Sequence, residues 1–395
     1  MEELFVTNYD KLLEEVRRLG MDAKWAKMFI KKLSDDERAF TMTEEEKKWA
    51  LTRGFYPGRI KLYGLNEDNY KNYLPEWYYF MLHPLNHHFK LWVNDKLTLK
   101  YILNSNGCQD SMPKYYLYVE NDGSYTYLMD APKNIGKNEN FIFNLLKEVK
   151  CLAMKPNSGT SGGFGFIKLE LIDDNLYENN KLIDTARFNE IIKNLPNYVI
   201  TEYVHQHEAL AKIWSKSECT LRVIMAKCPT DKPYTPAEWT CTVSYARFGS
   251  SISGGASNLS SGGIGIGFDF ETGRFNNSAI RYKKFCTDGN TNLTKHPDTQ
   301  VAWAGESLPN WSYVKNMLET ICSHIQSLSY LGFDIIITDK GMKLCEINTH
   351  PACDYEQVMC GPILAKKEAK KFFESKGMQK YNPQDFYEAY MRCQE

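Results

Sequence analysis

The sequence lacks the features of a membrane-spanning, secreted or strongly charged protein. No run approaches the roughly 18 apolar residues of a membrane span, and the amino terminus begins acidic, without a secretory apolar core. The eleven cysteines include no C-x-x-C pair, which argues against a disulfide framework or a zinc pattern. The net charge is only −1, so no global field favours nucleic acid. These absences predict a cytoplasmic protein with no membrane span and no nucleic-acid partner.

What is present indicates a large globular core. The chain has 395 residues, of which 43% are hydrophobic and 13% aromatic, enough for two or three subdomains. Many aromatic residues fall between residues 51 and 92, where core packing is a more ordinary role than stacking on sugars or bases. Two histidine groups, 83 to 88 and 205 to 207, have no third ligand at a recognisable spacing, so surface polarity is favoured over metal binding.

The most informative segment runs from residue 332 to residue 351 and predicts a β-hairpin. Two β-rich runs flank Asp339-Lys340-Gly341, and a turn centred on Lys340 places Asp334 opposite Glu346. Asn348 follows on the same face as Glu346. Two carboxylates and an amide oxygen suit Mg²⁺, which leaves positions for water and phosphate. The segment therefore predicts a Mg-nucleotide site.

The alternative is an ordinary hairpin with polar groups on an exposed face. Apolar residues on both faces argue for burial instead, and buried carboxylates need a partner or a metal. Strict alternation predicts that Cys345 faces away from Glu346, so its position gives no sign of catalysis.

A second segment, from Cys151 to Leu171, predicts a phosphate-binding loop. An apolar strand delivers Lys155, and Pro156 precedes a Gly/Ser-rich stretch that includes Ser161, Gly162 and Gly163. Backbone N–H groups in such a loop can approach phosphate oxygens closely, and the lysine adds a point charge. No Gly-Lys-Ser/Thr opens a helix here, so it is not a Walker loop. An ordinary glycine-rich hairpin loop is the alternative.

Together these segments resemble the ATP-grasp superfamily. The resemblance covers roughly residues 90 to 360, and its most specific piece is Glu346-Ile-Asn348-Thr-His-Pro351. It implies that ATP binds with two Mg²⁺ ions, for which Mn²⁺ is a substitute. The residues that it implies are Lys96, Lys155, Ser161, Gly162 and Gly163 for phosphates, Glu202, Tyr203 and Val204 for adenine, Glu208 for ribose, and Asp334, Glu346 and Asn348 for metal.

A closer likeness is to the ATP-grasp branch associated with sugar transfer and teichuronopeptide biosynthesis. It is carried by Gln206-His-Glu208, Cys219-Thr-Leu-Arg222, Tyr245-Ala-Arg247-Phe-Gly249 and Asn258-Leu-Ser-Ser-Gly262. The likeness implies an enzyme that joins an amine to a carboxylate, on a precursor of cell-surface or capsular polysaccharide.

One position departs from the pattern. D-alanine-D-alanine ligases carry an arginine two residues before the metal aspartate, where it steadies the intermediate, but this chain has Gly332 there. Arg222 and Arg247, on strand-like runs, are the candidates to replace it as catalytic residues beside Lys155. A structural ion pair is the alternative for each arginine.

The predicted fold class is α+β, an ATP-grasp fold with lid and core subdomains and a helical, aromatic-rich amino-terminal extension. Helices are expected over much of residues 1 to 50, and an amphipathic helix from Trp311 to Leu331. The predicted domains are residues 1–92, a preceding α/β unit at 93–150, a lid at 151–205, a core at 206–364 and a terminal helix at 365–395.

The predicted function is that of an ADP-forming carboxylate-amine ligase acting through an acyl phosphate. Its partners are then a small-molecule carboxylate and an amine, with a sugar nucleotide or polysaccharide precursor as one possible source. A kinase on the same fold is the strongest alternative, followed by an amino-acid ligase acting on a peptide or protein. A noncatalytic nucleotide sensor is the weakest, because the lysines and metal ligands are all present.

Overall fold

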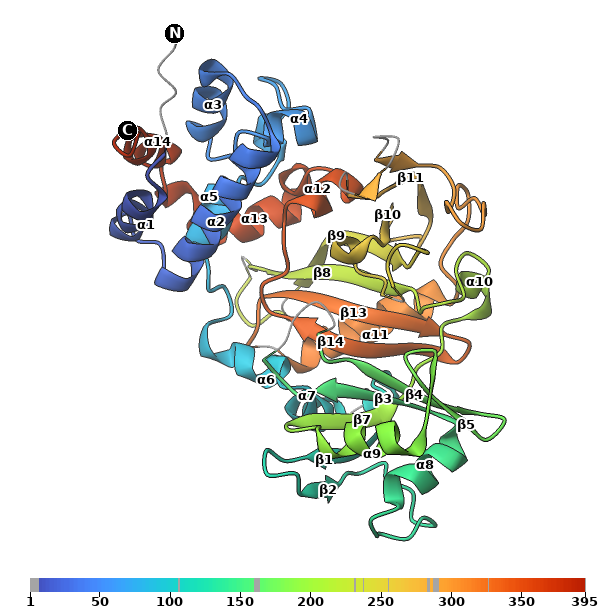
Figure 1. The fold of residues 1–395 in the computed structure, drawn as a ribbon. Coiled ribbons are helices and arrows are strands. Elements are labelled where there is room, and N and C mark those ends of the chain that lie inside the picture. The colour runs from blue at the N-terminus through green and yellow to red at the C-terminus, as the bar shows by residue number, and fades with distance from the viewer. Residues whose placement is uncertain are drawn as a thin grey trace.

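The computed structural model describes residues 7–105, 107–159, 164–230, 232–236, 238–254, 256–282, 285–286, 291–325 and 327–394. Within them the chain forms a helical unit and two antiparallel sheets of seven strands (Figure 1). This arrangement confirms the predicted α+β class.

The helical unit joins the two ends of the chain. Backbone pairing between Thr7 and Gln394 brings the first helix beside the last. Its aromatic residues form a core, in which Trp77 stacks on Phe386 and Phe29 contacts both rings, as expected for an aromatic-rich segment. The helices are α1 (Tyr9–Arg18), α2 (Ala23–Ala39), α3 (Glu44–Leu51), α4 (Arg59–Tyr63), α5 (Glu76–Met81) and α14 (Pro383–Met391), with the 3₁₀ turns η1 (Tyr70–Asn72) and η7 (Met378–Lys380).

A connecting segment leads from this unit to the sheets. It holds η2 (His87–Lys90), α6 (Leu91–Asn94), α7 (Lys96–Leu103) and η3 (Gln109–Ser111). Asp95 caps α7 by accepting from the Thr98 amide, so Lys96 is the first residue of that helix.

The first sheet, here called the lid sheet, has the order β2-β1-β7-β3-β4-β5-β6. Leu152 and Met154 pack against α8 (Phe141–Val149) and α9 (Thr185–Lys193) on one face, so the alternate residues Ala153 and Lys155 face the other way. The domain boundary expected at residue 150 falls inside this sheet, because β1 pairs with β7. The strands are β1 (Tyr115–Val119), β2 (Tyr125–Tyr127), β3 (Cys151–Pro156), β4 (Ile167–Ile172), β5 (Asn175–Glu178), β6 (Lys181–Ile183) and β7 (Tyr198–Glu202).

The second sheet, here called the core sheet, has the order β12-β11-β10-β9-β8-β13-β14. Its strands are β8 (Thr220–Cys228), β9 (Glu238–Phe248), β10 (Ile264–Phe268), β11 (Phe275–Ile280), β12 (Asn292–Leu293), β13 (Tyr330–Thr338) and β14 (Gly341–Asn348). The remaining elements of this region are α10 (Glu208–Ala211), η4 (Leu259–Ser261), α11 (Trp311–His324), α12 (Tyr355–Cys360), η6 (Ile363–Ala365) and α13 (Lys367–Ser375).

The two faces of the core sheet are covered differently. Val223 and Phe333 pack on one face with α7 and α11. Ile224 and Tyr330 pack on the other face with α12 and α13. The part of that face that these helices do not cover is turned toward the lid sheet. The helix expected from Trp311 to Leu331 ends at His324, because β13 begins at Tyr330 and needs the intervening residues as a connection.

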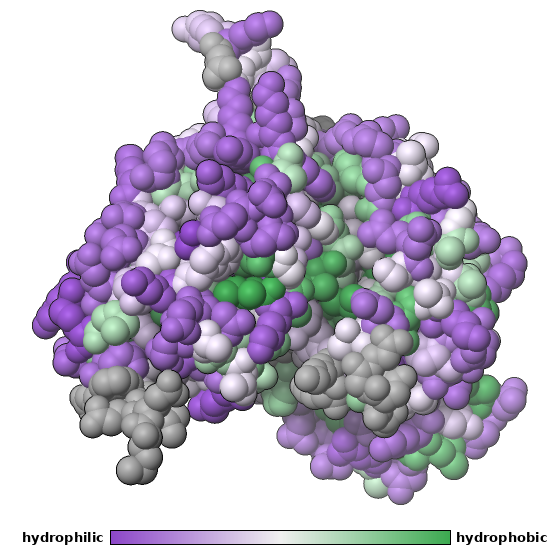
Figure 2. Space-filling view, turned by 90° about the horizontal axis from the view of Figure 1, so that it is seen from above, coloured by the Kyte–Doolittle hydropathy of each residue, from purple (hydrophilic) through white to green (hydrophobic). Residues whose placement is uncertain are grey.

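The surface seen from above is mostly hydrophilic, with apolar side chains gathered in a hollow near its middle (Figure 2). Among the described residues, no helix combines the length and apolar character needed to cross a bilayer.

Candidate functional site

A cavity of about 520 Å³ lies between the lid sheet and the core sheet. Six cationic side chains line it, against three carboxylates, an excess of three positive charges. The cations are Lys96, Lys155, Lys168, Lys216, Arg222 and Arg247, and the acids are Glu218, Asp334 and Glu346. An anionic ligand is favoured by this balance, because clefts lined by one sign of charge concentrate ions of the other sign.

The predicted hairpin exists, and it pairs Asp334 with Glu346 as expected. The route to that pairing differs from the one expected. Thr338 pairs with Gly341, so the turn is centred between Asp339 and Lys340, and a β-bulge between the two strands then shifts the register by one residue. Without the bulge, Asp334 would lie opposite Cys345.

The bulge also overturns the expectation for Cys345. That residue was expected on the face away from Glu346, but it lines the same cavity. The physical reason is that an inserted residue interrupts strict alternation, so two successive side chains can serve one face. Burial raises the pKa of the Cys345 thiol, which disfavours its reactive thiolate form.

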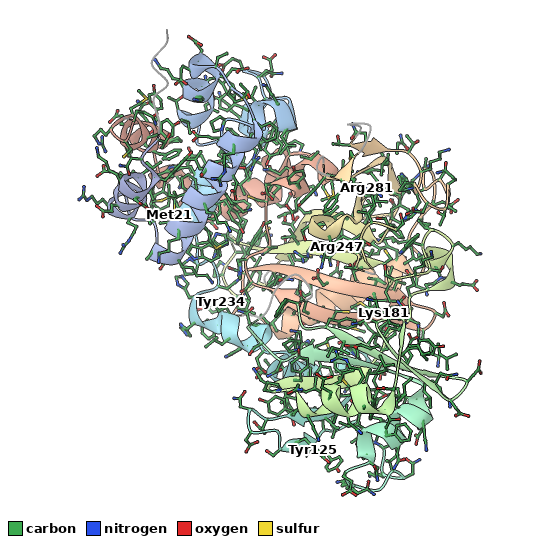
Figure 3. All side chains as sticks on the ribbon, viewed as in Figure 1. Met21, Tyr125, Lys181, Tyr234, Arg247 and Arg281 are labelled. Atoms are coloured by element: carbon green, nitrogen blue, oxygen red, sulfur yellow. The ribbon has the colours of Figure 1, made fainter. Side chains whose placement is uncertain are left out.

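A row of polar side chains crosses the core sheet at this level. Glu346 pairs with Asp334, Asp334 with Arg222, and Arg222 with Tyr245, each on the neighbouring strand. Directly opposed residues of antiparallel strands share a face, so this row points toward the lid sheet. Arg247 lies two residues beyond Tyr245 on β9 and extends from the same face near the middle of the molecule (Figure 3).

Both arginines contact Asp334. Arg222 donates from Nε to Oδ1 at 2.5 Å and from Nη2 to Oδ2 at 2.9 Å, which is a bidentate pair. Arg247 reaches Oδ1 with Nη2 at 3.0 Å and donates from Nε to Thr220 at 3.0 Å. Arg222 thus contacts both oxygens of the carboxylate, whereas Arg247 divides its donors among Asp334, Thr220 and Asn258.

The two carboxylates of the row have opposite pKa shifts. Burial opposes ionisation of Asp334, but the charges of Arg222 and Arg247 outweigh it and hold the pKa of Asp334 well below its usual range. Burial and then the charge of Asp334 raise the pKa of Glu346. A cation between the two carboxylates would relieve that repulsion.

Asn348 completes this group. Its Nδ2 lies 3.4 Å from Asp334 Oδ2 and 3.3 Å from Glu346 Oε1. Amide orientation is assigned from hydrogen bonding, and a flip would turn Oδ1 toward the same point. The three predicted metal residues therefore converge, although among the described residues no three His, Cys, Asp or Glu side chains form a metal-binding group.

Gly332 has a packing role at the position of the absent arginine. A Cβ atom there would lie 2.8 Å from the Pro351 ring and 3.4 Å from Cδ of Arg222. The glycine therefore leaves space for the Pro351 ring after β14 and for the stem of Arg222.

The two predicted phosphate lysines come from different elements and meet at the cavity. Lys96 lies at the first turn of α7 and donates to the Pro156 carbonyl at 3.1 Å, and Lys155 precedes Pro156, the last residue of β3. Burial lowers the pKa of Lys96, with Lys155 adding to the effect and Glu346 opposing it. An anion between the two ammonium groups would be strongly favoured.

Asn157 holds these lysines together and was missed by sequence reasoning. Its side chain accepts from the Leu97 amide at 2.9 Å and donates to Asp95 at 2.5 Å. It is buried directly after the Lys155 strand. The other predicted loop residues, Ser161, Gly162 and Gly163, lie outside the described residues.

Of the residues predicted to contact adenine and ribose, two line the cavity and two do not. Tyr203 and Val204 line the cavity, whereas Glu202 is turned toward the Lys114 amide, from which its Oε2 accepts at 3.0 Å. Glu208 is the first residue of α10, its amide donates to Asp339 Oδ1, and it does not line the cavity. The structure thus places Glu208 on α10 outside the cavity lining, and its contact with ribose stays a prediction.

Glu218 lies at the cavity wall in its place. It accepts from the Gln206 amide at 2.7 Å, and it precedes β8 so that Glu218, Thr220 and Arg222 all line the cavity. Glu218 precedes Thr220 and Arg222 at intervals of two residues, so strand alternation could have predicted that it shares their face. Lys168 and Lys216 were missed as well.

Lysines on one sheet and paired carboxylates on the other, around one cavity, are the arrangement of the ATP-grasp class. Within that class, the chain belongs to the sugar-transfer associated ATP-grasp family, whose model matches residues 81–372.

Solved structures show only a distant likeness. An ADP complex of N5-carboxyaminoimidazole ribonucleotide synthetase is 10% identical, with a TM-score of 0.36, over 66% of this chain and 45% of that one. The ATP-grasp ligase PsnB, solved with precursor, Mg and ADP, is 12% identical, with a TM-score of 0.37, over 74% and 62%. A D-alanine-D-alanine ligase from Coxiella burnetii is 11% identical, with a TM-score of 0.37, over 79% and 66%.

The aligned part thus spans less than half of the synthetase and less than two thirds of PsnB. No curated protein matches the sequence. Family membership rests on the match to residues 81–372.

Proposed function

We propose that the protein is an ATP-dependent carboxylate-amine ligase that forms ADP and an acyl-phosphate intermediate. The observation that carries the proposal is the opposition of Lys96 and Lys155 on one side of the cavity to Asp334, Glu346 and Asn348 on the other. A triphosphate placed between them would contact the ammonium groups on one side, and a divalent cation would lie between it and the carboxylates on the other.

The nucleotide would lie along the wall of the cavity. Tyr203, Val204 and Ile336 line it and offer apolar contact for a base. Glu218 replaces Glu208 in this proposal as the partner of the ribose hydroxyls, because it lines the cavity and Glu208 does not. Lys168 lies with its Nζ 4.7 Å from the centre of the Tyr203 ring, which fixes that ring at the wall.

The residues present fit a hard divalent cation. Asp334 and Glu346 supply carboxylate oxygens, and Asn348 supplies an amide oxygen after the flip described above. Asp334 can accept from the arginines and still ligate through Oδ2: Oδ1 uses both of its lone-pair sites on Arg222 and Arg247, whereas Oδ2 uses only one on Arg222. Mg²⁺ held there would offset the charge that develops during phosphoryl transfer.

The chemistry then needs one stabilised oxyanion. A carboxylate oxygen attacks the γ-phosphorus and ADP leaves; the amine then attacks the resulting acyl carbon, and the tetrahedral intermediate expels phosphate and loses a proton to give the amide. Arg247 is proposed to stabilise the tetrahedral oxyanion, since it has fewer bonds to Asp334 than Arg222 and lies beside Thr220, Ser257 and Asn258 on the cavity wall.

The family description supports a substrate linked to sugar transfer, and we propose a uronic acid or amino acid of a polysaccharide precursor as the carboxylate. Incubation of the protein with ATP, Mg²⁺, candidate uronic acids and candidate amines tests this by mass spectrometry. ADP, phosphate and an amide are expected. A stable phosphorylated product with no amide would identify a kinase, and AMP with pyrophosphate would exclude the acyl-phosphate route.

A further inference from the structure

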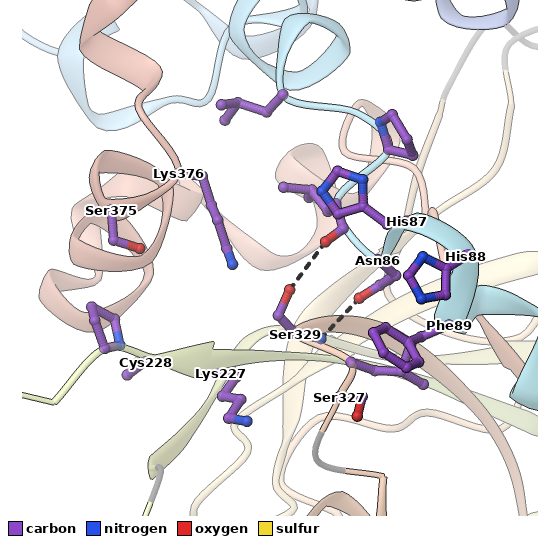
Figure 4. Close-up of a pocket in the computed structure, with 15 residues that line it drawn as sticks. Asn86, His87, His88, Phe89, Lys227, Cys228, Ser327, Ser329, Ser375 and Lys376 are labelled. Carbon is purple, nitrogen blue, oxygen red and sulfur yellow. Dashed lines mark hydrogen bonds between the residues drawn. The ribbon is translucent and has the colours of Figure 1, made fainter.

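The carboxylate substrate of the proposed reaction needs a place beside the nucleotide. A second cavity, of about 730 Å³, lies where the segment 82–89 meets the end of β8, the turn before β13 and the carboxyl end of α13 (Figure 4). It shares no lining residue with the cavity between the sheets. Because the carboxylate has to reach the γ-phosphate, it must bind in the cavity between the sheets.

One wall of that cavity takes no part in the nucleotide contacts proposed above. This wall, here called the substrate wall, is defined by the side chains of Lys216, Thr220, Arg247 and Ser257. They come from the turn before β8, the start of β8, the end of β9 and the Ser/Gly-rich segment that follows β9. The substrate wall is therefore built from the core sheet and its loops alone.

Close packing fixes the turn that carries Lys216. A Cβ atom on Gly249, just after β9, would overlap Ser217 Oγ and lie 2.7 Å from Trp214 Nε1. Only a glycine there lets this turn approach the end of β9 so closely. The Trp214 ring stacks on His296 with the ring centres 4.9 Å apart, and His296 Nε2 lies 2.9 Å from the Gly249 carbonyl oxygen. The turn is thus formed before any ligand arrives, which lowers the entropic cost of binding.

The substrate wall has one hydroxyl hydrogen available to a ligand. Thr220 Oγ1 accepts from Arg247 Nε at 3.0 Å and lies 2.8 Å from Ser257 Oγ. These two hydroxyl groups hold two hydrogens, and the bond between them uses one. Among the described residues the other hydrogen has no acceptor, so an oxygen atom of the substrate can take it.

Lys216 is a cation of this cavity that the nucleotide contacts do not use. The two phosphate lysines have their role, Lys168 pairs with Glu170 at 2.8 Å, and both arginines contact Asp334. Within the described part of the chain, Lys216 has no ion pair or hydrogen bond, and its Nζ lies 5.6 Å from the centre of the Trp214 ring. Its charge is therefore left for an anionic group of the ligand.

The two cations of the substrate wall lie at different levels of the core sheet. Along β9, Tyr245 is level with the metal group, Arg247 is two residues farther, and Gly249 two residues farther again. Because Ser217 packs against Gly249, its neighbour Lys216 lies at the far end of this series. A group held by Lys216 is therefore remote from the reacting atoms, and it orients the substrate without entering the reaction.

We propose that the substrate wall selects a carboxylic acid that carries a second anionic group. The carboxylate that reacts lies beside Arg247 and the hydroxyl pair of Thr220 and Ser257, and Lys216 holds the second anion. This inference rests on the proposed function and deepens it by naming the class of substrate. The second anion is a phosphate or a further carboxylate, and separate probes distinguish the two.

Isothermal titration calorimetry on the full chain tests the proposal, with Mg²⁺ and a non-hydrolysable ATP analogue bound. The analogue occupies the phosphate lysines, so an anionic probe cannot bind to them. Glucuronic acid 1-phosphate and glucaric acid carry a second anionic group, and glucuronic acid does not. At least one of the first two probes is expected to bind about tenfold or more tightly than glucuronic acid, because it gains a charge-assisted hydrogen bond.

The variant Lys216→Gln should remove this preference, so that all three probes bind with about the affinity of glucuronic acid. Its side chain is exposed, so the substitution leaves the core intact. Lys212→Gln is the matched control, because it changes an exposed lysine at the end of α10 that does not line the cavity. This control should bind the probes as the parent does.

Two results would overturn the proposal. One is that neither probe with a second anion binds the parent more tightly than glucuronic acid, and the other is that the preference survives in Lys216→Gln.

The proposed function fails by different results. If no amide forms in the ligation assay but the preference and its loss in Lys216→Gln are both observed, the reaction is another one and the anion subsite stands. If the analogue does not bind, the proposed use of ATP is wrong, and the same titration without nucleotide decides the subsite by the same two comparisons.

Discussion

At the scale of single residues, Glu346 carries the plainest test of the metal assignment. It is buried beside Asp334, and that proximity raises its pKa. The variant Glu346→Gln keeps the shape and removes the charge that a cation would neutralise. We expect turnover to fall at least about 10²-fold, roughly 2.7 kcal/mol in activation free energy, at every Mg²⁺ concentration. Steady-state kinetics with a magnesium titration measures it, and near-parent turnover at saturating magnesium would reject the assignment.

The two arginines make a matched pair for a second test. Arg222 binds both oxygens of Asp334, whereas Arg247 binds one of them and Thr220. Arg247→Met should lower amide formation by about 10²- to 10³-fold with ATP affinity almost unchanged. Arg222→Met should instead lower the thermal stability, because Asp334 loses its bidentate partner in a buried site.

Nucleotide affinity and melting temperature, measured beside turnover, separate these outcomes. If Arg247→Met ligates at the parent rate, the oxyanion is stabilised by another group. If both variants lose ATP binding, the arginines belong to the triphosphate site.

At the scale of elements, the hairpin shows what a sequence does and does not predict. Its strands and its turn residues follow from composition and spacing, whereas the pairing of Asp334 with Glu346 is reached only through the bulge. The bulge does not follow from them, because it depends on how β14 fits against β13 and the lid rather than on the residue types in it. The position of Glu218 at the cavity is likewise set by the fold, since Glu208 is carried on α10 and Glu218 precedes β8.

Cys345 tests the bulge directly. It lines the nucleotide cavity, whereas the similarly half-buried Cys151 does not. ATP with Mg²⁺ should slow alkylation of Cys345 by iodoacetamide and leave the rate at Cys151 unchanged. Peptide mapping by mass spectrometry measures both in one sample. Equal rates at Cys345 with and without nucleotide, under conditions where ATP binding is verified, would contradict its placement at the cavity.

Gly332 tests the packing between β13 and the segment after β14. The methyl group of Gly332→Ala would lie 2.8 Å from Pro351, so one of the two segments must move. We expect a loss of about 1–3 kcal/mol in the free energy of unfolding, measured by urea denaturation, together with reduced turnover. Gly136→Ala is the control, because its new methyl group meets only the Asn138 side chain at 3.3 Å. Equal stability of the two variants would show that the contact is not tight.

At the scale of the whole molecule, the helical unit and the family region are joined by buried charges. Arg59 donates to Asp36 at 2.9 Å and to Glu76 at 2.5 Å, and its Nη2 lies 3.9 Å from Asp354. Lys32 also contacts Asp354 at 3.0 Å. Asp354 follows Asn348 by six residues, so the helical unit holds the segment that follows β14.

This contact could not be predicted from the sequence. Lys32 and Asp354 are separated by 322 residues, and their charges alone resemble those of any solvated helix or loop. Most of the unit lies outside the matched range of 81–372, so family membership says little about it. Local pattern thus predicted the elements and several residues that line the cavity, whereas the fit between distant segments required the structure.

The same region predicts how stability depends on pH. Glu356 is 6% exposed, its Oε1 accepts from the Tyr245 hydroxyl at 3.2 Å, and among the described residues Oε2 has no partner. Burial and then the charge of Asp354 raise the pKa of Glu356 from 4.5 to about 7. Between those two values the folded protein keeps a proton that the unfolded chain has released, so this group lowers the free energy of unfolding as pH rises.

Glu356→Gln removes that titration and keeps the shape of the side chain. Relative to the parent, the variant should therefore gain stability as pH rises from 4.5 to 7, by an amount on the order of 3 kcal/mol, and the difference should level off above pH 7. Urea denaturation across this range measures it, with Glu368→Gln on the exposed start of α13 as the control. Burial raises the pKa of Asp36 to about 6 and lowers that of His83 to about 4, but both residues are common to all three proteins and cancel in the differences. The contrary result is a difference in the free energy of unfolding, between the parent and Glu356→Gln, that does not change with pH. Glu356 would then have the same pKa in the folded and unfolded states. Burial and the charge of Asp354 would in that case not raise its pKa.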